Sequence, residues 1–133
     1  MSNSLIKTVT LKHTNKVEIL KNIEVLLVGT NIINESNNMI EDIDYRESKG
    51  NIEVYPNVLL PHIKASYVKK AQIILVKNKD SAINWNDKKA ELIILLLIPE
   101  KTDEDVQSKI RDFMKNLASE EYIQKLMKRS NKL

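Results

Sequence analysis

The sequence predicts an α/β fold, a layered sandwich in which helices flank a central mixed β-sheet. Two short runs, 71–76 and 92–98, are apolar at nearly every position and rich in branched side chains. This pattern is typical of strands that are covered on both faces. Helical patterns of apolar residues stand before and after these runs. The order of helices, then strands, then helices favours a sheet between two helical layers.

The N-terminal third predicts one strand and two helices. Alternating apolar and polar residues over 7–12 predict an edge strand. Apolar residues at helical spacing then predict a first helix, with Thr14 as its N-cap and Gly29 as the C′ residue that ends it. After an asparagine-rich turn, a second helix is expected to begin at Met39 and to end before Gly50.

The remaining elements follow from short local signals. A loop is expected to lead into a small buried strand at 58–60, and 80–89 is expected to be a polar connection between the two central strands. Thr102 and Asp105 have the spacing of a capping box that opens an amphipathic helix, and Ser119 is expected to cap the last helix.

Length and composition exclude several classes of protein. With 133 residues and 42% hydrophobic residues, we expect residues 1–133 to form a single domain with a real core. The absence of cysteine excludes disulfides, thiol catalysis and thiolate metal sites. Two glycines are too few for a phosphate-binding loop or a dinucleotide-binding fingerprint.

The charge distribution argues against nucleic-acid binding. Four of the 21 basic residues lie in 124–133 without an acid, which leaves 17 basic residues against 18 acidic ones before that segment. A nucleic-acid binder should instead carry a basic face with aromatic or hydrogen-bonding readers, and aromatics are 5% here. No apolar signal core or membrane-length apolar run is present, so we expect a cytoplasmic protein.

The chain has two histidines, His13 and His62. Two such ligands without cysteine make a poor zinc site, and no serine has the glycine-flanked elbow of a hydrolase, so we expect no metal and no catalytic triad. We interpret His13, in a polar stretch, as solvated. His62 follows a buried-strand signature and a proline, and strand ends are where open α/β sheets place their sites. Position alone nevertheless favours a structural or merely exposed histidine.

A longer pattern surrounds His62. Arg46-Glu47 closes the second predicted helix, Gly50 follows, and a short strand ends in Leu60-Pro61-His62. Further on come Ile83-Asn84-Trp85 and a strand ending in Ile98-Pro99-Glu100. In order and spacing, residues 5–128 resemble the fructose/mannitol-type enzyme IIA domain of the bacterial phosphoenolpyruvate-dependent sugar phosphotransferase system.

The resemblance implies a phosphocarrier in sugar transport. His62 would accept a phosphoryl group from the general phosphocarrier protein HPr and pass it to a sugar-specific enzyme IIB, and membrane association would come only through enzyme IIC. Arg46 would stabilise the phosphoryl group, because its planar fork can hold two oxygens. We expect Leu60 and Ile63 to help form the partner-docking surface, and no cofactor to be needed.

Two departures from the family pattern keep a second hypothesis open. The loop before His62, residues 51–57, lacks the usual glycines, and Val106 stands near the place of a second active-site histidine. A regulatory enzyme IIA-like domain, as in sugar-responsive transcription regulators, would be read by a protein partner through the charge of its phosphoryl group.

Overall fold

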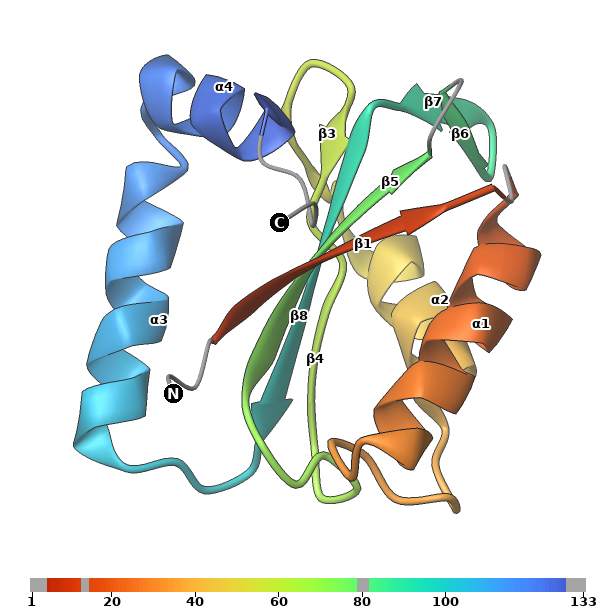
Figure 1. Cartoon of the computed structure of the whole chain (residues 1–133), viewed down its shortest axis with the longest axis vertical. Coiled ribbons are helices and arrows are strands. Elements are labelled where there is room, and N and C mark those ends of the chain that lie inside the picture. Colours follow the sequence, from red (N-terminus) through yellow and green to blue (C-terminus); the bar gives the residue numbers. More distant parts are fainter. Residues whose placement is uncertain (1–4, 13–14, 79–81, 129–133) are drawn as a thin grey trace.

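The structure is a computed structural model, and it describes residues 5–12, 15–78 and 82–128. Figure 1 shows a twisted sheet with helices on both sides. The elements in chain order are β1 (Ile6–Leu11), α1 (Lys16–Gly29), α2 (Met39–Lys49), β2 (Glu53–Tyr55), β3 (Val58–Leu59), β4 (His62–Ala65), β5 (Gln72–Asn78), β6 (Ile83–Trp85), β7 (Lys88–Ala90), β8 (Leu92–Pro99), α3 (Glu104–Asn116) and α4 (Glu120–Lys128).

The six-stranded sheet is mixed, as the sequence predicts. Its strand order is β1-β5-β8-β3-β2, and β4 also pairs with β8. β5 runs antiparallel to β8, whereas β1 is parallel to β5, and β3 and β4 are parallel to β8. The predicted edge strand is confirmed as β1, and the two apolar runs are confirmed as the central strands β5 and β8. Among the described residues, β4 pairs with β8 alone, so its outer side is an edge of the sheet.

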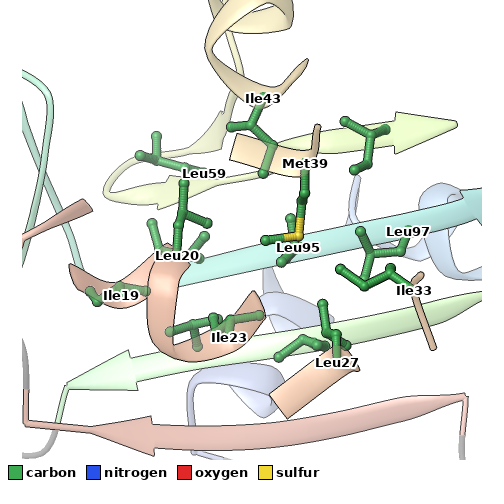
Figure 2. Packing of buried hydrophobic residues seen from close by; sticks show 14 of the residues in the cluster. Ile19, Leu20, Ile23, Leu27, Ile33, Met39, Ile43, Leu59, Leu95 and Leu97 are labelled. Atoms are coloured by element: carbon green, nitrogen blue, oxygen red, sulfur yellow. The ribbon is translucent and has the colours of Figure 1, made fainter. Parts of the chain in front are cut away.

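Two apolar cores cover the two faces of the sheet. The first lies under α1 and α2, where Leu20, Met39 and Ile43 pack against Leu59 and Leu95 (Figure 2). The second lies under α3 and α4. This confirms the predicted layered sandwich. Across the described residues, no helix combines the length and apolar character that crossing a lipid bilayer requires.

Several helix ends differ from the prediction. Thr14 and His13 lie outside the described residues, and the N-cap of α1 is Asn15, whose side chain accepts a hydrogen bond from the Glu18 amide at 2.9 Å. At the other end, Gly29 belongs to the helix, and Asn31 adopts the left-handed conformation that we expected of the glycine, with φ of 64°. Asparagine tolerates this conformation better than most residues.

The predicted N-cap residue of α3 is also wrong. Asp103, between the two predicted partners, is the N-cap and accepts from the Val106 amide at 2.9 Å. Both Thr102 and Asp103 are capping residue types, so the local sequence left the choice open. The predicted cap of α4 is confirmed, because the Ser119 hydroxyl accepts from the Tyr122 amide at 3.2 Å.

The predicted buried strand at 58–60 is confirmed as β3, but two hairpins were not predicted. β2 pairs with β3, and β6 pairs with β7 across a turn at Asn86, which has φ of 58°. Trp85, in the stretch expected to be polar and connecting, is 1% exposed and belongs to the first core. Both hairpins are too short for apolar alternation to reveal them.

Candidate functional site

His62 begins β4 at the edge of the sheet. It is paired with Leu96 of β8, and the carbonyl of Pro61 accepts from the Leu96 amide at 3.0 Å. Leu96 belongs to the core under α3 and α4, whereas the next residue, Ile63, belongs to the core under α1 and α2. Because side chains alternate along a strand, the imidazole points to the α3 and α4 side.

The two ring nitrogens of His62 have different surroundings. Nδ1 is buried and has no hydrogen-bond partner among the described residues, although the residue as a whole is only half-buried. An enclosed polar atom without a partner is uncommon and costs free energy. Nε2 is not among the enclosed atoms that lack a partner, so the two nitrogens differ in their surroundings.

Arg46 lies near the C-terminal end of α2 and its side chain is exposed. It follows Met39 by seven residues and Ile43 by three, so all three residues share one face of the helix. Met39 and Ile43 are fully buried against the sheet. Arg46 therefore extends the sheet-facing side of α2 beyond the core, and its guanidinium makes no hydrogen bond or ion pair with a described residue.

A contact between α2 and the end of β4 sets the direction of the helix. The Tyr67 hydroxyl donates to Asp42 Oδ2 at 2.5 Å, and α2 packs against β4. Burial, with this hydrogen bond to the carboxylate, raises the pKa of Tyr67 above its ordinary value. Arg46 lies one turn after Asp42, while His62 lies five residues before Tyr67. The contact thus joins the first part of α2 to the residues after β4, whereas Arg46 lies near the end of α2 and His62 at the start of β4.

Glu47, next to Arg46, is the centre of a polar cluster. Its Oε1 accepts from Lys16 Nζ at 2.6 Å and from Asn86 Nδ2 at 2.9 Å, and its Oε2 accepts from Trp85 Nε1 at 2.7 Å. Lys16 Nζ also contacts Asp44 Oδ1 at 2.6 Å and lies 5.3 Å from the centroid of the Trp85 ring. The side chains of Lys16 and Glu47 are 8% and 10% exposed. Glu47 and Trp85 both stand in motifs noted in the sequence, but no local pattern predicts that they meet.

The structure buries both Leu60 and Ile63, which we expected to help form the docking surface. Leu60 is 5% exposed and Ile63 is 2% exposed, and they pack into opposite cores. Buried side chains cannot offer a surface to a partner. Tyr45, on the exposed side of α2 beside Arg46, is instead 61% exposed.

A basic pocket that we did not predict lies on the same side of β4 as the imidazole. It has a volume of about 640 Å³ and contains Lys64, two residues after His62, together with Lys101 and Arg111. Glu100 is the one acidic residue in its lining. Within the described part of the chain, no group of three histidine, cysteine or acidic side chains could hold a metal ion.

Comparison with protein-family models gives a match over residues 1–132 to the family described as "Phosphoenolpyruvate-dependent sugar phosphotransferase system, EIIA 2". A comparison with curated protein sequences found no match.

The fold is shared with several solved structures. The nitrogen regulatory protein IIA-Ntr from Neisseria meningitidis is 18% identical, with a TM-score of 0.65 over 95% of this chain and 90% of that one. Enzyme IIAMTL from Escherichia coli, in complex with phosphorylated enzyme IIBMTL, is 15% identical, with a TM-score of 0.66 over 98% of this chain and 90% of that one. At such identities the likeness shows the fold alone.

Proposed function

Because the chain belongs to the EIIA 2 family of the phosphoenolpyruvate-dependent sugar phosphotransferase system, we propose that it carries a phosphoryl group on His62. The group would come from HPr and pass to a sugar-specific enzyme IIB. The observation that carries this proposal is the position of His62, a half-buried residue at a sheet edge whose Nδ1 is enclosed without a hydrogen-bond partner among the described residues, unlike its Nε2.

Nε2 is the nucleophile in this proposal. A neutral imidazole has one nitrogen with a free electron pair, and a proton on Nδ1 leaves that pair on Nε2. The pair attacks phosphorus, so that the Nε2–P bond forms while the bond between phosphorus and the donor atom breaks. The donor atom of HPr keeps the electron pair of the broken bond. Transfer to enzyme IIB repeats the exchange with Nε2 as the leaving atom, so no metal or further reactant is required.

Arg46 is the group that we expect to bind the phosphoryl oxygens. Its exposed guanidinium has no protein partner among the described residues, and it continues the face of α2 that packs on the sheet. Because α2 and the imidazole lie on opposite faces of the sheet, this role requires the Arg46 side chain to pass around the β4 edge. A planar guanidinium can donate to two phosphoryl oxygens at once and offset the charge of the transition state.

The basic pocket beside Lys64 suits the approach of a phosphorylated donor. Lys64, Lys101 and Arg111 outnumber Glu100 there, so the field on that side of β4 attracts negative charge. Such attraction speeds encounter without requiring a large interface, and a carrier must release each partner. We expect Tyr45 to add exposed apolar contact area on the α2 side.

The test is phosphorylation of the purified protein by phosphoenolpyruvate, enzyme I and HPr. We expect acid-labile label on the wild type and none on His62→Ala. His62→Gln keeps a side chain of similar size, so it tests whether the label requires the imidazole itself, and it should also carry none. A His13→Ala variant is the matched control, because it removes the other histidine, and it should label normally. Failure to label the wild type, or undiminished label on His62→Ala, would refute the proposal.

The second candidate function is a regulatory role. It is supported by the fold that the chain shares with the nitrogen regulatory protein IIA-Ntr. In that case, phosphorylation of His62 would change binding to a protein partner instead of supplying a transporter. Rapid onward transfer from phosphorylated protein to an enzyme IIB supports transport. Stable phosphoprotein in the presence of several enzymes IIB supports regulation.

A further inference from the structure

We infer that Glu47 is a positioning residue that holds the last turn of α2, and with it Arg46, in place for phosphoryl transfer. The inference rests on the proposed function, since it assigns Glu47 a role only through Arg46. It uses the polar cluster of Lys16, Glu47, Trp85 and Asn86, which connects three elements far apart in the sequence.

The second half of α2 has no apolar anchor. The buried residues of the helix, Met39 and Ile43, both lie in its first two turns (Figure 2). From Asp44 to Lys49 every side chain is exposed except that of Glu47, which is half-buried by whole-residue exposure. The helix then ends at Gly50 in extended backbone. Without another attachment, this last turn would be free to fray.

Glu47 supplies that attachment. One carboxylate oxygen accepts from both Lys16, at the start of α1, and Asn86, at the turn of the β6–β7 hairpin. The other oxygen accepts from the Trp85 indole, which is itself fixed in the first core. Three donors from two other elements fix both the position and the rotation of the residue beside Arg46.

The charge of Glu47 matters as much as its shape. A carboxylate accepts at both oxygens, and its hydrogen bonds are charge-assisted. The amide of glutamine has one acceptor oxygen, so Glu47→Gln cannot accept from Lys16, Asn86 and Trp85 in the same arrangement. The last turn should then move relative to β4, and a misplacement of about 1 Å at a reacting group can cost roughly 100-fold in rate.

The experiment is a double-mutant cycle on the full chain, measuring single-turnover phosphoryl transfer from phosphorylated HPr. We expect Glu47→Gln to lower the rate about 10- to 100-fold in the wild-type background, with little change in half-saturation by HPr. In the Arg46→Ala background, the same substitution should have almost no further effect on rate, because the group that Glu47 positions is already gone. Glu47→Gln should also lower the melting temperature, and it should do so in both backgrounds, because the polar cluster is disrupted in each.

Each outcome has a distinct meaning. An equal rate loss in both backgrounds, or no loss in either, would overturn the positioning role of Glu47 while His62 labelling still supports the proposed function. A normal rate for Arg46→Ala would overturn the role of Arg46 and this inference together, again without touching His62. Undiminished label on His62→Ala would instead overturn the proposed function.

Two further variants guard against a folding defect. Trp85→Phe keeps the ring in the core but removes one donor to Glu47, so it should give a smaller rate loss that also vanishes in the Arg46→Ala background. Asp44→Asn is the matched control: it contacts the same lysine at 2.6 Å, but its side chain is 60% exposed. It should transfer within about twofold of wild type, and a rate loss as large as that of Glu47→Gln would overturn the inference.

Discussion

The two halves of α2 are attached to the protein by different forces. The first half buries Met39 and Ile43 completely against the sheet. The second half, which carries Arg46, is attached through the hydrogen bonds and ion pair of the enclosed Glu47 carboxylate. Apolar contact is strong but has no fixed direction, whereas hydrogen bonds from several donors fix an orientation. The first half of α2 therefore secures the fold, and in our proposal the second half places the Arg46 side chain.

The largest effect is expected from the apolar half. Ile43→Ala removes a fully buried side chain from the first core, and such substitutions cost about 2–5 kcal/mol. Urea denaturation of the variant and the wild type would measure this loss in the free energy of unfolding, and the two m-values should be equal. A cost below about 1 kcal/mol would contradict the packing described here. Phosphoryl transfer by the remaining folded protein should stay near the wild-type rate.

A smaller loss of stability is expected from the polar half. Lys16→Met keeps a long apolar stem but removes the buried ammonium, leaving Glu47 with its two neutral donors. Loss of a partner for a buried group costs about 1–3 kcal/mol. The matched control is Lys88→Met, because Lys88 and Glu53 form an exposed pair at 3.8 Å. That variant should lose less than about 1 kcal/mol, and equal losses in the two unfolding curves would argue against a special role for the cluster.

The smallest effect concerns the contact between Tyr67 and Asp42, and it depends on pH. Tyr67→Phe removes a hydrogen bond and should cost about 0.5–1.5 kcal/mol near neutral pH. Because the folded state raises the pKa of Tyr67, it holds this proton more tightly than the unfolded chain does. The stabilisation is therefore complete below the ordinary tyrosine pKa of about 10 and declines as pH rises above it.

Denaturation curves at pH 7 and above pH 10 would check this. The stability difference between wild type and Tyr67→Phe should narrow at the higher pH. A difference that widens there would mean that the sign of the pKa shift is wrong.

Local patterns were enough to predict most of the fold. The branched apolar runs identify β5 and β8, and periodic apolar residues identify the helices, because each signal lies within one segment. The helix caps were less predictable. Asn15 and Asp103 act where neighbouring residues of similar capping ability were expected, and sequence alone does not decide between adjacent candidates.

The polar contacts around the candidate site were not predictable in the same way. Lys16, Glu47 and Trp85 are separated by 31 and 38 residues in the chain, and no local period connects them. The burial of Leu60 and Ile63 was unpredictable for a related reason. Their apolar character was visible, but their burial in opposite cores depends on how the strand sits between two helical layers.

The most direct test of the account is to identify the atom that carries phosphorus. The chain has two histidines, so NMR of phosphorylated protein containing ¹⁵N-labelled histidine can resolve each ring nitrogen through its coupling to phosphorus. We predict phosphorus on Nε2 of His62. Phosphorus on Nδ1 of His62 or on His13, or an unphosphorylated protein after incubation with phosphorylated HPr, would contradict the account.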